Sequence, residues 1–302
     1  MRLSIWPGVD QPWPDLLALA RFADRSGWDT LYLEDHFVPH PPDDEEAPLL
    51  EVTAGLSALA AATSRIRLGT LVLSITYRHP AVIANWAATL DQVSAGRLVL
   101  GLGAGWQELE HEQYGLRLGP AGERVDRFVE AVQIVRGLLT QRRTSLDGRH
   151  FTVRDAVCEP KPVQSPLPIL VGAKGDRMLG VVARYADRWN LWAAPDRFAE
   201  RSTALDARCE QAGRDPASIA RSTQALLCLT DDPARATAFL AEGGPRPRLA
   251  GSAESLAAQI AAYAGLGADE FIVVDEGLGR GAEREDTLSA LREAFLVTQQ
   301  AR

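Results

Sequence analysis

The sequence predicts a (β/α)8 TIM barrel, and three observations support this fold class. Eight short apolar runs recur along the 302 residues, each followed by a segment with helical character. The runs are continuously apolar rather than alternating, as is typical of parallel strands that are buried on both faces. A chain of this length suits eight such units closed into one barrel, with an open doubly wound sheet as the alternative.

The predicted strands alternate with predicted helices in a regular order. The strands are residues 3–6 (LSIW), 30–34 (TLYLE), 66–74 (IRLGTLVLS), 97–103 (RLVLGLG), 167–172 (LPILVG), 186–192 (ADRWNLW), 222–230 (STQALLCLT) and 270–275 (EFIVVD). The clearest helices cover residues 15–26, 50–63, 80–94 and 123–140. Asp215 followed by Pro216 indicates a further helix start, with an N-cap and a proline at the first helical position.

Three irregular insertions interrupt this order. They follow strands 2, 4 and 7 and comprise residues 35–48, 104–122 and 243–252. Loops at the carboxyl ends of barrel strands build the active site in this fold class, so we expect the insertions to shape a pocket. Residues 144–153 predict a hairpin around Asp147-Gly148. No linker or longer repeat is visible, so residues 1–302 are expected to form a single domain.

Composition restricts the function classes. The net charge of −8 argues against binding to nucleic acid or to an anionic membrane, and no apolar run reaches the roughly 18 residues of a membrane span. The amino-terminal residues lack the pattern of a targeting signal, so we expect a cytoplasmic protein. Cys158, Cys209 and Cys228 are far apart and predict buried thiols rather than a metal site or disulfide.

Residues 94–106 (SAGRLVLGLGAGW) contain a dense group of glycines. Gly101, Gly103 and Gly105 alternate with other residues, and Trp106 stands where a dinucleotide fingerprint has its third glycine. Three strand–helix units precede this segment, so it is expected to be the end of the fourth strand and its loop. The glycines either let the backbone approach a ligand or form a tight turn.

Residues 65–106 (RIRLGTLVLSITYRHPAVIANWAATLDQVSAGRLVLGLGAGW) resemble the signature of the bacterial luciferase-like superfamily, whose members are (β/α)8 flavin or deazaflavin oxidoreductases. Other blocks are similar to this superfamily in the same order, namely residues 31–37, 158–175, 183–190 and 250–273. Residues 101–115 and 122–140 look most like the branch that uses coenzyme F420, a 5-deazaflavin.

The resemblance implies roles for individual residues. It implies that His36 acts at the reaction centre. It implies contacts with the cofactor ring from Asp35, from a cis peptide at Leu71-Val72 and from Ala104, Gly105 and Trp106. It implies a phosphate loop at Gly172, Ala173, Lys174 and Gly175, where a helix N-terminus favours an anion. We expect the substrate pocket to include Trp6, His40, Asn190 and Trp192.

Some residues depart from the family pattern or allow two interpretations. Trp106 stands where the sugar-phosphate dehydrogenase of this family has a glutamate, so a sugar phosphate is not expected as the substrate. Arg246 and Arg248 either meet the anionic tail of F420 or lie in a solvated loop. Glu51 is interpreted as a first-turn acid of a helix, with a buried paired carboxylate as the alternative. Arg97 is expected to form a structural ion pair.

The remaining histidines have structural interpretations. His36 and His40 are four residues apart, but the prolines between and after them exclude the helix that a metal-binding pair would need. His79 is expected to cap the helix that begins at Pro80, and His111 to be an ordinary surface or loop residue.

The predicted function is F420-dependent hydride transfer between the deazaflavin ring and a small organic substrate, with His36 as proton donor or hydrogen-bonding partner. The alternative on the same fold is a monooxygenase that uses reduced FMN and O2, supplied by a separate reductase. A third possibility is a non-catalytic barrel subunit. The resemblance also implies a homodimer.

Overall fold

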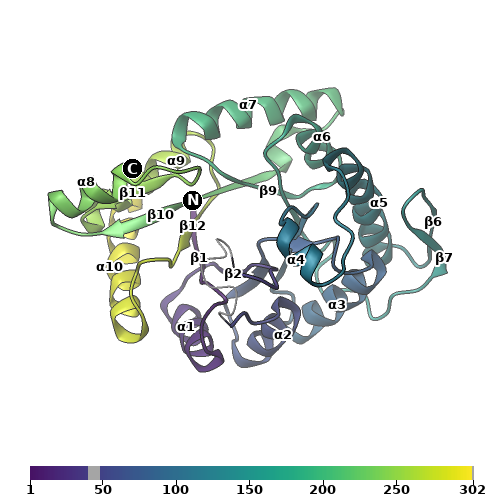
Figure 1. Cartoon of the computed structure of the whole chain (residues 1–302), viewed down its shortest axis with the longest axis horizontal. Coiled ribbons are helices and arrows are strands. Elements are labelled where there is room, and N and C mark those ends of the chain that lie inside the picture. Colours follow the sequence, from purple (N-terminus) through teal and green to yellow (C-terminus); the bar gives the residue numbers. More distant parts are fainter. Residues whose placement is uncertain (40–47, 301–302) are drawn as a thin grey trace.

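Parallel strand pairing forms a closed ring at the centre of the computed structural model, which describes residues 1–39 and 48–300 (Figure 1). The ring contains β1 (Arg2–Trp6), β2 (Thr30–Leu33), β3 (Arg67–Thr70), β5 (Leu98–Gly103), β8 (Ile169–Gly172), β9 (Arg188–Trp192), β10 (Ala220–Leu229) and β12 (Glu270–Val274). Pairing of β9 with β10 and of β12 with β1 closes it. The predicted (β/α)8 barrel is therefore confirmed, and the open sheet is wrong.

Helices enclose the ring. The main helices are α1 (Trp13–Ser26), α2 (Val52–Ala62), α3 (Pro80–Val93), α5 (Ala121–Thr140), α6 (Asp176–Tyr185), α7 (Pro195–Gln211), α9 (Ala253–Gly265) and α10 (Gly281–Gln300). His79 caps α3 as predicted, because its Nδ1 accepts the Ala81 N–H at 3.2 Å. In the part of the chain that the structure describes, no helix is long and apolar enough to cross a membrane.

Several smaller elements refine the prediction. The hairpin is confirmed as β6 (Thr144–Asp147) and β7 (Thr152–Ala156). The Asp215-Pro216 signal begins only a 3-10 turn (Pro216–Ser218), because β10 starts two residues later. Residues 243–252 are not wholly irregular, since β11 (Arg248–Gly251) pairs with the far end of β10. The remaining elements are β4 (Leu73–Ser74), α4 (Glu108–Gln113) and α8 (Pro233–Ala241).

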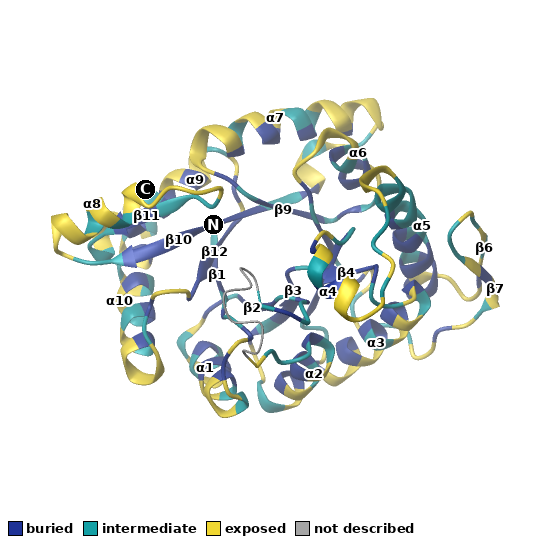
Figure 2. Ribbon diagram, viewed as in Figure 1, coloured by how far each residue is buried: buried dark blue, intermediate teal, exposed yellow. Residues whose placement is uncertain are grey.

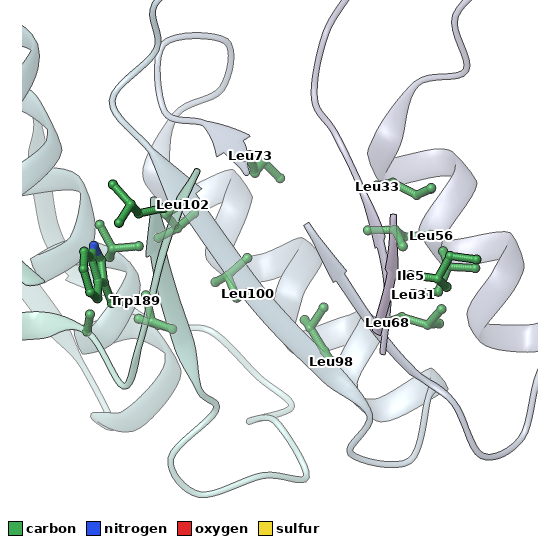
Figure 3. Packing of buried hydrophobic residues seen from close by; sticks show 14 of the residues in the cluster. Ile5, Leu31, Leu33, Leu56, Leu68, Leu73, Leu98, Leu100, Leu102 and Trp189 are labelled. Atoms are coloured by element: carbon green, nitrogen blue, oxygen red, sulfur yellow. The ribbon is translucent and has the colours of Figure 1, made fainter. Parts of the chain in front are cut away.

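The outward faces of the strands supply the main core. Alternate strand residues such as Ile5, Leu31, Leu68 and Leu98 are fully buried and pack toward the helices (Figure 3). Figure 2 shows the same pattern across the fold, with buried strands and with helices that expose only their outer faces. The three cysteines are free and buried, as predicted from their spacing.

The inward faces of the strands are partly polar. At the amino-terminal end of the barrel, the Glu270 carboxylate accepts hydrogen bonds from Ser4 (2.5 Å) and Tyr32 (3.2 Å) and pairs with Arg188 (3.5 Å) and Arg2 (3.7 Å). Burial, together with the Glu270 charge, raises the pKa of the Tyr32 hydroxyl. The interior is thus a filled polar and apolar core rather than a channel.

The glycines of β5 make room for a neighbouring side chain. A methyl group on Gly101 would overlap the Thr70 carbonyl oxygen, and one on Gly103 would lie 2.5 Å from Val72 Cγ2. Gly105 adopts a φ of +81°, which side chains rarely tolerate. The glycine group therefore serves close packing against the protein itself and a turn out of the strand.

The contacts of Arg97 differ from the ion pair that was predicted for it. Its guanidinium donates to the carbonyl oxygens of Ala60 (2.8 Å), Ile66 (2.8 Å), Thr63 (3.0 Å) and Ser94 (2.7 Å). No carboxylate among the described residues lies within ion-pair distance of it. Arg97 is therefore structural, as predicted, but it fastens backbone turns instead of forming an ion pair.

We expect Gly101→Ala to destabilise the fold by about 1–3 kcal/mol, the usual cost of overpacking a core. Gly180→Ala is the matched control, because a methyl group at this helical position meets nothing within 4 Å and alanine favours a helix by about 0.5–1 kcal/mol. Urea unfolding measures both changes. Equal stability of the Gly101→Ala variant and the wild type would contradict the packing role of this glycine.

Candidate active site

The candidate site lies where barrel strands reach their carboxyl ends. Residues 34–39 follow β2, residues 75–79 follow β4, and residues 104–107 lead from β5 into α4. These connections bring together side chains that are far apart in the sequence. Among them is His36, the predicted catalytic residue.

Asp35 anchors the connection after β2. It is 3% exposed and accepts the Ser74 N–H at 2.8 Å. Arg78 binds both of its carboxylate oxygens, at 2.7 and 3.1 Å. Burial raises the pKa of Asp35, although the Arg78 charge and hydrogen bonds oppose this. Because both oxygens are engaged by the protein, Asp35 acts here as a positioning residue.

Arg78 extends this anchor to a third connection. Its guanidinium also contacts the Glu51 carboxylate. Glu51 is the N-cap of α2 and accepts the Ala54 N–H at 2.7 Å. Glu51 therefore serves the helix start, as predicted, although it is the N-cap rather than a first-turn acid. It is also ion-paired, as in the alternative, but its side chain is 39% exposed rather than buried.

His36 is held by Glu110 of α4. The His36 Nδ1 lies 3.0 Å from Glu110 Oε1, and the Phe37 N–H donates to Glu110 Oε2 at 2.8 Å. The Tyr77 hydroxyl contacts the same carboxylate. Glu110 is fully buried, whereas the His36 side chain keeps 16% exposure. With Nδ1–H donated to Glu110, Nε2 is the nitrogen that can serve another group.

The surroundings of His36 favour its protonated form. Burial alone would lower the pKa of the imidazole. The hydrogen bond to Glu110 and the negative charges of Glu34, Glu110 and Asp35 outweigh this effect and raise the pKa above its ordinary value. Burial also raises the pKa of the neighbouring Glu34 carboxyl, with the His36 charge opposing it. The site therefore favours the protonated form of His36 more than water would.

A second buried histidine supports α4. His111 Nδ1 donates to the Gln107 carbonyl oxygen at 2.5 Å, and Nε2 lies 2.7 Å from Thr76 Oγ1. The Thr76 hydroxyl also lies 2.6 Å from Ser74 Oγ. His111 is 3% exposed, so its interpretation as a surface or loop residue is wrong. It joins α4 to the connection after β4.

The residues expected at a cofactor ring lie near His36 and in the barrel mouth. The Leu71-Val72 peptide is cis, as expected from the resemblance. The Trp106 ring is 53% exposed and meets the His36 ring edge-on, with 5.5 Å between centroids. Val72 and Trp6 each pack against a small apolar cluster inside the barrel, and the centroids of the Trp6 and Trp192 rings are 5.6 Å apart. Ala104 and Gly105 are partly exposed beside Trp106.

The expected phosphate loop follows β8. The Ala173 backbone is fixed by the Asn190 carbonyl oxygen (3.1 Å) and by the Trp189 indole N–H (3.0 Å). Lys174 and Gly175 are exposed. Gly175 is the N-cap of α6, and it carries no side chain to satisfy the first N–H groups of that helix. This leaves them available to an anion.

Asn190 lines the barrel, but its side chain is committed to neighbours. Its amide nitrogen donates to Ser222 Oγ at 2.9 Å and to Gln224 Oε1 at 2.8 Å, and its amide oxygen accepts from Gln224 at 3.1 Å. Its side chain therefore orders the interior between β9 and β10. His40 lies outside the described residues.

The two arginines of the third insertion have different surroundings. Arg246 pairs with Glu276 at 2.8 Å and lies 5.8 Å from the centre of the Trp192 ring. Arg248 pairs with Glu242 at 2.8 Å and stacks on Phe239. Only Arg246 thus contacts a residue predicted for the substrate pocket.

Sequence reasoning missed the groups that hold His36. Glu110 lies in the strongly acidic segment ELEHEQ, a composition typical of a solvated surface helix. Tyr77 and Arg78 lie in a connection with no distinctive spacing. These residues are identified only in the structure, where the connections after β2, β4 and β5 come together. Among the described residues, no group of three or more His, Cys, Asp or Glu side chains is arranged to hold a metal ion.

Comparison with known proteins places the chain in a family. Residues 1–243 match the family model described as luciferase-like monooxygenase, and the chain belongs to this family.

Curated relatives carry more specific names. An F420-dependent glucose-6-phosphate dehydrogenase of Beutenbergia cavernae is 32% identical over 222 residues, which cover 73% of this chain and 65% of the relative. Its counterpart in Kineococcus radiotolerans is 33% identical over 78% of this chain and 70% of the relative. An F420-dependent hydroxymycolic acid dehydrogenase of Mycobacterium tuberculosis is 32% identical, covering 74% and 61%. The matches span less than two thirds of the length of the first and the third of these relatives.

Solved structures share the fold over its full length. An F420-dependent secondary alcohol dehydrogenase in complex with an F420-acetone adduct superimposes with a TM-score of 0.86 at 20% identity, covering 97% of this chain and 98% of the other. The coenzyme F420-dependent tetrahydromethanopterin reductase of Methanopyrus kandleri gives a TM-score of 0.82 at 18% identity, covering 99% of both chains.

We expect Glu110→Gln to lower the pKa of His36, because the amide cannot supply the negative charge that holds the imidazolium. NMR titration of the His36 ring measures this change, and Glu108→Gln on the exposed side of α4 is the control. The protonated pair stabilises the wild-type fold at pH values below the ordinary pKa of 6.5. That contribution is lost as the pH rises through the raised folded-state pKa. An unchanged His36 pKa in Glu110→Gln would show that Glu110 does not control the proton.

Proposed function

We propose that the protein is an F420-dependent oxidoreductase that transfers hydride between the deazaflavin ring and a small organic substrate. The observation that carries this proposal is the His36–Glu110 pair, a proton-holding imidazole fixed by a fully buried carboxylate at 3.0 Å. It lies at the carboxyl end of the barrel, where enzymes of this fold class have their active sites. The names of the relatives, which are F420-dependent dehydrogenases, support the choice of cofactor.

The residues present fit a cofactor of this kind. The first N–H groups of α6 have no side-chain cap, and Lys174 is exposed directly before them. An uncapped helix start with an adjacent ammonium group suits a phosphate. Gly172, Ala173, Lys174 and Gly175 would hold that phosphate. Leu71, Val72, Ala104, Gly105 and Trp106 would border the ring, which Asp35 supports indirectly by fixing the neighbouring connection.

The contacts of His36, Glu110 and Asp35 support a separate role for each residue. When bound, the deazaflavin supplies the two-electron hydride chemistry. His36 holds the proton that reaches the substrate oxygen when a carbonyl carbon gains a hydride, and it accepts that proton in the reverse direction. Glu110 keeps the imidazole charged and oriented, and Asp35 with Arg78 fixes the backbone on which His36 stands. The exposed Trp106 ring covers one side of His36.

The chain departs from its glucose-6-phosphate-oxidising relatives at the reaction centre. Trp106 stands where the resemblance implies a glutamate, so this chain offers an indole rather than a carboxylate beside His36. Trp6 and Trp192 add aromatic surface in the barrel mouth. We therefore propose an apolar or aromatic alcohol or carbonyl compound as the substrate, and not a sugar phosphate. A cytoplasmic homodimer completes the proposal, supported by the reduced cysteines and by the family resemblance.

The purified protein should bind F420 more tightly than FMN. Lys174 of the phosphate loop and Arg246 near the barrel mouth are both cationic and suit the longer anionic tail of F420. Separate titrations followed by ring absorbance or fluorescence test this expectation. Tighter binding of FMN would replace the proposal with an oxygen-using monooxygenase that depends on a reductase. Failure to bind either cofactor would favour a non-catalytic barrel.

His36→Ala should leave cofactor binding unchanged and reduce turnover by about 100-fold or more, within the range of general acid–base catalysis. Turnover is measured with the alcohol or ketone that the wild type uses best. His79→Ala is the control, because His79 caps α3 on the surface. Turnover equal to the wild type would remove His36 from the mechanism.

A further inference from the structure

A pocket lies at the end of the barrel opposite the candidate active site. Its volume is about 490 Å³, and its walls come from the starts of β1, β2 and β3 and from the last turns of α10. These are the amino-terminal ends of the strands, whereas His36 stands after the carboxyl end of β2. The pocket is therefore separate from the candidate active site.

Arginine dominates the charge of this pocket. Arg2, Arg65, Arg67 and Arg292 line it, and Asp29 is the one acid among its lining residues. This is unusual for a chain with a net charge of −8. Arg2 reaches Glu270 at 3.7 Å. Within the described residues, the other three arginines have no carboxylate at ion-pair distance.

The hydrogen bonds of these arginines leave donors unused. Arg65 reaches the Arg25 carbonyl oxygen at 3.4 Å, Arg292 the Gly27 carbonyl oxygen at 2.9 Å, and Arg67 the Gln164 side chain at 3.1 Å. Among the described residues, the buried Arg67 Nε–H has no hydrogen-bond partner. The Trp28 indole N–H also has none within this part of the chain, and Trp28 is 4% exposed in the pocket wall.

Arg97 is a half-buried arginine in the same molecule whose hydrogen bonds are satisfied, because four carbonyl oxygens accept from its guanidinium. Arg67 lacks such a set. Burial, together with the nearby charges of Arg188 and Arg2, lowers the pKa of its guanidinium, although the Asp29 charge opposes this. Unpaired donors and mutual repulsion both cost free energy, and an anion between the arginines would relieve both.

We propose that this pocket is a second ligand site that binds the phosphoryl group of a small organic phosphate. Guanidinium groups recognise phosphate oxygens through paired N–H donors, and Arg67 with Arg292 would supply them from β3 and α10. Leu3, Phe295 and Leu296 line the remaining wall and suit an apolar organic moiety. The volume falls in the range of small-molecule sites.

The experiment is calorimetric titration of the full chain at low ionic strength with inorganic phosphate, with phenyl phosphate, and with acetate as the anion control. Phenyl phosphate should bind more tightly than inorganic phosphate, because only it fills the apolar wall. Arg67→Met and Arg292→Met should each weaken its binding at least ten-fold. Arg197→Met is the control, since Arg197 is an exposed arginine on α7 paired with Glu200.

Lys174→Ala distinguishes binding in the pocket from binding of a phosphate at the start of α6. This variant should lose any binding at the α6 start and keep binding in the pocket lined by the arginines. Arg292→Met keeps the test valid if Arg67→Met fails to fold, because Arg292 is partly exposed and, within residues 1–39 and 48–300, donates to a single carbonyl oxygen. The proposal is overturned if phenyl phosphate does not bind, if Lys174→Ala alone abolishes binding, or if Arg197→Met weakens it as much as the pocket variants.

Discussion

The bidentate ion pair between Arg78 and Asp35 is the constraint on which the candidate active site depends. It joins the connection after β2 to the connection after β4, and through Glu51 it reaches the start of α2. His36 is the next residue after Asp35, so its backbone is fixed by this contact. Tyr77, the neighbour of Arg78, contacts the Glu110 carboxylate that holds the His36 ring. One short segment, residues 74–78, therefore supports His36 from its backbone and from its partner.

Packing inside the barrel determines the position of residues 74–78. Gly101 and Gly103 leave space that Val72 and the Thr70 carbonyl group occupy, and a larger residue at either position would push β3 away from β5. Close packing of this kind makes the exit directions of neighbouring strands interdependent. The positions of His36 and Glu110 are consequently set by the main barrel as well as by their own connections.

The fold was largely predictable because its strands carry a strong local signal. Continuous apolar runs located all eight barrel strands, and the Asp147-Gly148 turn located the hairpin. β11 escaped prediction, since its four residues are too short a signal and become a strand by pairing with the extended end of β10. At the site, His36 and the Leu71-Val72 cis peptide were reached through resemblance. Glu110, Arg78 and His111 were not, because their roles arise from contacts between segments that sequence periodicity does not report.

The extension of β10 has a consequence for association with other chains. Closure of a barrel leaves none of its strands with an unpaired backbone edge. β10 continues beyond the ring and pairs with β11, and in the described part of the chain β11 ends the sheet on that side. Among the described residues, β11 is therefore an edge strand of the sheet, with a strand partner on one side. Its short length and the Gly251 backbone, at a φ of +142°, limit how far another strand could follow it.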